Sequence, residues 1–372
     1  MPPLTSRTLG LAFDMAGCPN RCRHCWITCP PNRRLDVDAL REAVRLFRDD
    51  RAPGERERFF HRLHVMTWHR EPDFHPDYRS LRELELELSD QPLADDLEVL
   101  SIWRLAREPG YACWARERRG ARVCQVTLFG VGATHDWFFR RPGAFNDALF
   151  ATAALLDAGI RPRWQVFLTK RSIPELRAFK GLVARTRLRE ACGEIGGEFV
   201  IFLNTPGPEG EAFQIEHLRP TADDVRSVPR WLERATCDRL RTDTPFGETE
   251  GALVRRVLRD GLGITPYEPP LLWLNVTPDL DVYPGHAETT EWWRLGNLRN
   301  DSVRQVVQAY ERDSVPGLHA TYHLPLPALA QRFGRRYGRR MYQPVDLRSR
   351  WVGQWLRAEH PLAQRVRGKV ST

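Results

Sequence analysis

Residues 18–25 read Cys18-Pro-Asn-Arg-Cys22-Arg-His-Cys25, a C-x3-C-x2-C run that follows the short apolar segment 8–14. Thiolates are the usual protein ligands of iron–sulfur clusters. Three of them can hold three irons of a cubane cluster, and the fourth iron then stays open to a small molecule. We therefore predict that Cys18, Cys22 and Cys25 are metal ligands on a loop after a first strand.

Two other metal sites use the same kinds of ligand. A structural zinc site needs four tetrahedral ligands, and His24 or Cys29 could supply the fourth, although no second pair of ligands is present. An electron-transfer cluster is the other alternative, because Cys29-Pro30 extends the run towards a ferredoxin pattern, with a first gap of three residues instead of two. Four of the eight cysteines lie within residues 18–29, which favours a metal site over a dispersed disulfide framework.

Short apolar runs alternate with segments of helical spacing along the chain. The predicted strands are 8–14, 60–67, 98–104, 122–129, 163–168 and 198–203, and the predicted helices are 36–49, a segment after 76, 109–118, 143–158, 173–185 and 221–235. Six strands with intervening helices predict parallel βα units. The predicted fold class is α/β, a partial (β/α)6 TIM barrel, and a doubly wound open sheet is the alternative.

The alternation of predicted strands and helices ends at about residue 240. Residues 271–276 and 281–284 predict two short strands joined by a turn, and residues 301–312 predict a helix. This is a small C-terminal β-hairpin-plus-helix extension. The predicted division of the chain is a barrel of residues 1–240, an extension of residues 241–330 and a basic tail of residues 331–372.

The positive charge is concentrated in the tail. The chain carries a net charge of +8, and residues 331–372 contain eleven basic against two acidic residues, which leaves the rest of the chain nearly neutral at −1. Such a tail can attract nucleic acid, phosphorylated substrates or an acidic redox partner, or it can be a solvated surface. Its aromatic residues could stack on RNA or pack the tail onto the barrel; they are Phe333, Tyr337, Tyr342, Trp351 and Trp355.

No apolar run approaches the roughly 18–20 residues of a membrane helix. Residues 1–10 also lack the apolar core of a secretory signal. We therefore expect a cytoplasmic protein without a membrane partner.

The C-x3-C-x2-C loop after a first strand resembles the signature of the radical S-adenosylmethionine (SAM) superfamily, and the resemblance covers roughly residues 8–315. It implies a partial TIM barrel and a [4Fe-4S] cluster whose open iron is chelated by the amino and carboxylate groups of SAM. It also implies reductive cleavage of SAM to a 5′-deoxyadenosyl radical that abstracts hydrogen from a substrate.

Residues 68–77 resemble the family's Gly-Gly-Glu-Pro segment, with Glu71 in register and with His69 and Arg70 in place of the two glycines. On this match Glu71 receives the SAM amino group, as suits a carboxylate beside an ammonium.

Residues 125–145 resemble the family's fourth strand with its following loop and helix. Thr127 on this strand and Gln165 on the fifth predicted strand are the expected further contacts of SAM. His135 and Asp136 are expected to position the loop.

Residues 274–298 resemble the SPASM or twitch extension of many radical SAM enzymes. In that extension a cysteine that binds an auxiliary cluster follows Tyr-Pro, but here Gly285 stands at this place, followed by His286, and no cysteine occurs after Cys237. The resemblance thus implies an extension that has lost its auxiliary clusters.

These features predict an enzyme that abstracts hydrogen from a small polar metabolite or natural-product intermediate. Without an auxiliary cluster a redox-neutral outcome, such as epimerisation or rearrangement, is favoured. The family implies a flavodoxin or ferredoxin as reductant. Modification of a ribosomal peptide or an RNA is one alternative, and a non-catalytic cluster- or zinc-binding protein is another.

Overall fold

The computed structural model of the chain describes residues 7–51, 54, 56–90, 99–266, 271–285 and 287–359. Glu98, where the third predicted strand begins, lies outside the described residues, as do His286 and the parts of the predicted barrel and tail at 1–6 and 360–372.

The strands are β1 (Thr8–Phe13), β2 (Arg62–Met66), β3 (Val123–Leu128), β4 (Arg161–Phe167), β5 (Val200–Asn204), β6 (Glu248–Thr249), β7 (Leu272–Val276), β8 (Asp281–Pro284), β9 (Gly296–Asn297) and β10 (Met341–Tyr342). The helices before β6 are α1 (Val37–Asp49), α2 (Tyr78–Leu88), α3 (Ile102–Leu105), α4 (Tyr111–Arg118), α5 (Ala133–Phe139), α6 (Ala144–Asp157), α7 (Ala178–Arg185), α8 (Leu188–Glu194), α9 (Ala222–Val225) and α10 (Arg230–Leu240), with the 3-10 helices η1 (Ile173–Glu175) and η2 (Gly210–Leu218). The later helices are α11 (Glu250–Asp260), α12 (Val303–Glu311), α13 (Pro316–Tyr322), α14 (Leu326–Phe333) and α15 (Pro344–Glu359).

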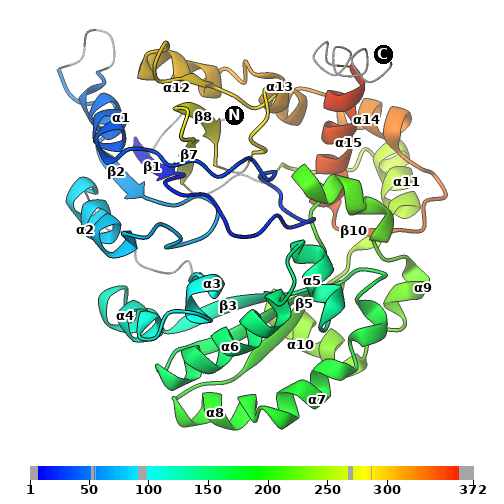
Figure 1. Cartoon of the computed structure of the whole chain (residues 1–372). Helices are drawn as coiled ribbons and strands as arrows, with labels where there is room; N and C mark the ends of the chain where they lie inside the picture. The colour runs from blue at the N-terminus through cyan, green and yellow to red at the C-terminus, as the bar shows by residue number, and fades with distance from the viewer. Residues whose placement is uncertain are drawn as a thin grey trace, which may run out of the picture.

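Two sheets with parallel strands organise the molecule. The first has the order β2-β1-β7-β8-β9, in which β1 pairs in parallel with both β2 and β7, and the second has the parallel order β3-β4-β5. Figure 1 shows β1 and β2 above β3 and β5, and the dark-blue chain that follows β1 runs between them. The fold is therefore a mixed α/β fold with parallel sheets.

In helix α1 the capping residue and the spacing of apolar residues are enough to predict the helix. Asp36 caps the helix by accepting from the backbone N–H of Asp38, and Leu40, Val44 and Phe47 are buried on one face. The prediction of a helix over residues 36–49 is confirmed.

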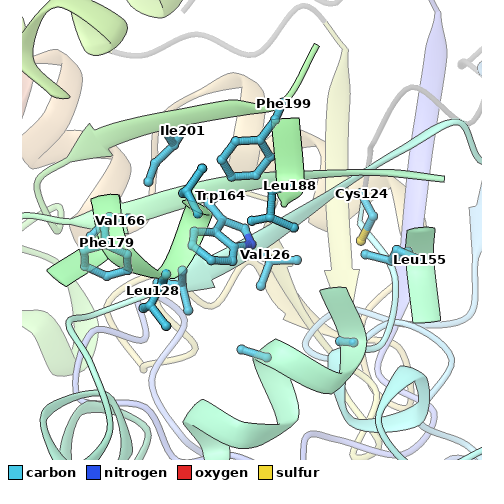
Figure 2. Close-up of a cluster of buried hydrophobic side chains, with 14 of the residues drawn as sticks. Cys124, Val126, Leu128, Leu155, Trp164, Val166, Phe179, Leu188, Phe199 and Ile201 are labelled. Atoms are coloured by element: carbon cyan, nitrogen blue, oxygen red, sulfur yellow. The ribbon is translucent and has the colours of Figure 1, made fainter. Parts of the chain in front are cut away.

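The second sheet contains the larger core. Val126 and Leu128 from β3 and Trp164 from β4 are buried together with Phe179 from α7 and Leu188 from α8 (Figure 2). Along β3 buried and half-buried positions alternate, so that Val126 and Leu128 face this core whereas Gln125 and Thr127 lie on the other face of the strand.

The third predicted strand is wrong. Residues 102–105 form the short helix α3, which Ser101 caps by accepting from the backbone N–H of Arg104. Leu100 and Leu105 are buried against the β3–β5 core. A short apolar run fits a strand or a buried helical turn equally well, and periodicity alone does not separate them.

The predicted hairpin is confirmed, because β7 and β8 pair antiparallel and α12 follows. Its first strand also pairs in parallel with β1, with Leu9 opposite Leu272. The extension thus continues the sheet whose strand β1 leads into the loop with Cys18, Cys22 and Cys25, called here the cysteine loop. The domain boundaries remain predictions.

The described part of the tail packs onto the body. Tyr342 and Trp351 are fully buried, whereas Tyr337 is exposed. Arg350 forms a buried ion pair with Glu250 at 2.7 Å, and further tail arginines pair with acidic residues of the body, namely Arg339 with Asp223, Arg340 with Glu216 and Arg357 with Glu288. Four of the tail's eleven basic residues are therefore paired with acidic residues of the body. No helix among the described residues has both the length and the apolar character needed to cross a membrane.

Candidate functional site

The start of the cysteine loop is held by a buried ion pair. Arg70 donates from Nε to Asp14 at 2.8 Å, and Asp14 accepts from the backbone N–H of Gly17 at 2.9 Å. Gly17 has a φ of +89°, and a Cβ there would lie 2.1 Å from the Asn32 side chain. Arg70, which stands where the resembling motif has glycine, thereby ties the end of β1 to the segment after β2.

Three distant segments contact the middle of the loop. Arg23 donates its backbone N–H to Phe138 O at 2.7 Å, Glu211 donates to Cys25 O at 2.8 Å, and Thr289 donates to Ile27 O at 3.2 Å. These bonds place the loop against α5, the start of η2 and the chain after β8.

Cys18, Cys22 and Cys25 line one cavity of about 260 Å³, together with Glu71 and Thr127. The cavity lies where β1, β2 and β3 end, which is the end at which parallel α/β folds place their chemistry. Burial raises the pKa of Cys22, and the nearby thiols of Cys18 and Cys29 raise it further. Three soft thiol donors gathered at one cavity fit an iron–sulfur cluster.

Among the described residues no three His, Cys, Asp or Glu side chains surround a point as ligands of a metal ion. Of the two fourth ligands considered for zinc, His24 packs its ring against Phe129 and Phe167 at centroid distances of 4.3 and 5.3 Å. Burial lowers the pKa of His24 to about 3, so the ring is neutral. Cys29 lies within hydrogen-bonding reach of Cys25.

Glu71 is half-buried in the wall of the cavity. Its Oε1 accepts from Ser101 Oγ at 2.8 Å and from the Trp103 backbone N–H at 3.5 Å. Burial raises the pKa of Glu71 to about 7, against the opposing effect of the Ser101 hydrogen bond. Ser101 was missed in the sequence, and its signal was that of a serine before a helix rather than a residue in a strand.

Of the two other predicted SAM contacts, Thr127 lines the cavity and Gln165 is not among its lining residues. Gln165 accepts from Gln125 Nε2 at 2.8 Å, and Gln125 Oε1 accepts from Arg163 at 3.2 Å. Gln125 lines the cavity, and its hydrogen bond connects Gln165 to the site; the contact of Gln165 with SAM stays a prediction.

His135 and Asp136 hold the loop after β3. Asp136 accepts from the backbone N–H groups of Gly143 and Phe145 at 2.7 and 2.8 Å. His135 Nδ1 accepts from the Phe129 backbone N–H at 3.2 Å, so the hydrogen of the neutral ring is on Nε2. Burial lowers the pKa of His135 to about 3, and the ring lines the cavity as a neutral donor.

Gly285 stands where the resemblance predicts the auxiliary-cluster cysteine, and the structure leaves little room for a side chain at this position. A Cβ on Gly285 would lie 2.5 Å from Trp273 Cβ and 3.0 Å from Trp273 O. A side chain larger than glycine therefore does not fit there without movement of β7.

Comparison with known proteins rests on structure. No protein-family model matches the chain, and no curated protein matches it. The solved structure of native anSMEcpe with bound AdoMet has a TM-score of 0.52 and 10% sequence identity, over 97% of this chain and 100% of that chain. A histidine-tagged form of anSMEcpe with bound AdoMet has a TM-score of 0.51 and 11% identity, over 99% and 96%. Native anSMEcpe with bound AdoMet and Kp18Cys peptide has a TM-score of 0.50 and 10% identity, over 97% and 99%. The chain thus has the fold of anSMEcpe.

Proposed function

We propose that this chain is a radical SAM enzyme that binds a [4Fe-4S] cluster through Cys18, Cys22 and Cys25 and binds SAM in the adjoining cavity. The observation that carries the proposal is that the three cysteines share one cavity with Glu71 and Thr127. The fold, which is shared with the AdoMet-bound structure of anSMEcpe, supports it. When bound, the cluster supplies the electron that splits SAM into methionine and a 5′-deoxyadenosyl radical.

In this proposal the two parallel sheets are the two sides of a partial (β/α)6 TIM barrel. The pairing of β2, β1 and β7 and of β3, β4 and β5 supports this arrangement, since all these pairs are parallel. The region after β7 is then a twitch-like extension without auxiliary clusters.

The chain's own residues would hold SAM by polar contacts. Glu71 keeps Oε2 free of the bonds that Ser101 and Trp103 make to Oε1, so this oxygen receives the ammonium group. Thr127 and Gln125 face the cavity with groups that can bond ribose or carboxylate oxygens. His135 offers a neutral N–H donor, because its Nδ1 is already engaged.

We propose a small polar metabolite or natural-product intermediate as substrate, with a redox-neutral outcome. The closed position at Gly285 supports an outcome that needs no second cluster. A ribosomal peptide is the second candidate, and the likeness to anSMEcpe bound to Kp18Cys peptide favours it. We propose a flavodoxin or ferredoxin as reductant, and the cytoplasm as the location.

The test is anaerobic reconstitution with iron and sulfide, followed by SAM and dithionite. We expect 5′-deoxyadenosine from the wild type and none from Cys22→Ala. A well-formed cluster that yields no 5′-deoxyadenosine, and whose electron-spin spectrum does not change with SAM, would contradict the proposal. A cluster-binding or zinc-binding protein without catalysis would then be the better account.

A further inference from the structure

A second cavity lies beside α15, outside the cysteine site. This α15 cavity has a volume of about 270 Å³. Its apolar wall contains Pro266, Trp293, Val345, Val352 and Leu356, and its polar groups include Glu209, Glu288 and Asp346. An apolar pocket with a few convergent polar groups is the usual form of a small-molecule site.

Two of its three carboxylates have ion partners. Asp346 pairs with Arg219, and Glu288 pairs with Arg357 at 3.4 Å and accepts from the Gly210 backbone N–H at 2.8 Å. Arg348, which itself lines the cavity, donates to the backbone oxygens of Ile264 and Thr321.

Glu209 has no ion pair with any described residue, and its hydrogen-bond partner is the Ser349 hydroxyl. Burial raises the pKa of Glu209 to about 7, and the charges of Asp346 and Glu288 add to this effect. A half-buried carboxylate without a counter-charge is costly, so such a group takes up a proton or a cation.

A second group in the same wall has no hydrogen-bond partner among the described residues. The indole Nε1 of Trp293 is buried and has no hydrogen-bond acceptor among the described residues. Aromatic faces attract organic cations, and an indole N–H needs an acceptor when it is buried. The wall therefore leaves two polar groups open to a ligand.

The α15 cavity borders the cysteine loop. Gly210, which follows Glu209, has a φ of +54°, and a Cβ there would lie 2.4 Å from the backbone oxygens of Cys25 and Trp26. Glu211 donates its backbone N–H to Cys25 O at 2.8 Å. A ligand held by Glu209 thus sits next to the loop that carries the cysteines.

We propose that the α15 cavity binds the cationic amine or guanidine group of the substrate, with Glu209 as its counter-charge. The apolar part of the ligand lies against Val352 and Leu356. This assignment of a substrate class rests on the proposed radical SAM function, but binding itself requires neither the cluster nor SAM.

The test uses two probes of equal shape, phenethylamine and the uncharged 2-phenylethanol, titrated calorimetrically into the full chain without SAM at about pH 8, where the amine is charged. A charge-assisted hydrogen bond predicts that the amine binds about tenfold more tightly or better. Glu209→Gln should remove this preference, and Glu194→Gln, a matched change of an exposed glutamate on α8, should leave it intact.

Equal binding of the two probes to the wild type would overturn the assignment, whatever the variants do. A preference that survives in Glu209→Gln would overturn the role of Glu209. The proposed function fails separately: amine binding without any 5′-deoxyadenosine would leave the α15 cavity as a cation site and remove the radical chemistry.

Discussion

The cysteine cavity and the α15 cavity have similar volumes, about 260 and 270 Å³, but they are built differently. The cysteine cavity collects residues from the ends of successive parallel strands and carries a motif. The α15 cavity collects residues from the chain after β5, the chain after β8, α13 and α15, and carries no motif. A site assembled at strand ends can be found from sequence, whereas a site between late helices becomes visible only in three dimensions.

Substitution of the cysteines should distinguish the two cavities most strongly. We expect Cys25→Ser to lose the cluster absorption completely, since a cubane cluster held by three thiolates does not keep its site with two. Cys29→Ser is the control and should keep it. The amine preference of the α15 cavity should be unchanged in both. If Cys29→Ser loses the metal and Cys25→Ser retains it, the assignment of the ligands is wrong.

Glu71 gives the next largest effect. Glu71→Ala should weaken SAM binding to the reconstituted protein about ten- to hundredfold, because it removes a charge-assisted hydrogen bond. Glu209→Gln, a change in the other cavity, should leave SAM affinity within about twofold. Equilibrium binding of SAM measures both, and an unchanged affinity in Glu71→Ala would place the ammonium elsewhere.

Glu209 provides a pH test. Its pKa is raised in the fold from 4.5 to about 7, so the folded state holds the proton more tightly than the unfolded chain. The stabilising effect of this proton is present below about pH 4.5 and is lost as the pH rises through about 7.

Between these limits the free energy of unfolding of the wild type should fall by about 1–2 kcal/mol relative to Glu209→Gln. This is less than the full conversion of the pKa difference, because water screens a half-buried group. Urea unfolding of both proteins at about pH 4 and pH 8 measures it. Both proteins contain Glu288 and Asp346, so the difference between their free energies of unfolding reports mainly the titration of Glu209. If the free energies of the two proteins change equally with pH, the pKa of Glu209 is not raised in the fold.

Gln165 should give the smallest effect. Since it acts through Gln125, Gln165→Ala should weaken SAM binding by only about two- to threefold, and Gln125→Ala should weaken it more. A larger loss in Gln165→Ala than in Gln125→Ala would mean that Gln165 itself contacts the ligand.

Short-range sequence patterns predicted correctly those elements that depend only on their own residues. Asp36 and the face of Leu40, Val44 and Phe47 sufficed to predict α1. They failed at residues 98–104, where the apolar run is short and Ser101 bonds to Glu71, 30 positions earlier in the chain. The buried ion pair of Arg350 and Glu250 could not be predicted either, because the two residues are one hundred positions apart. From the sequence alone, the tail could be described only as basic.

The sequence by itself determined the cysteine motif, most of the parallel strands and the absence of a cysteine at position 285, because each depends on residue type and short-range spacing. Only the tertiary structure decided that β7 pairs with β1, that Gln125 rather than Gln165 faces the cysteine cavity, and that Glu209 is half-buried without an ion partner among the described residues. These depend on which distant segments share a surface. Desolvation and pairing are properties of that shared environment rather than of any single stretch of chain.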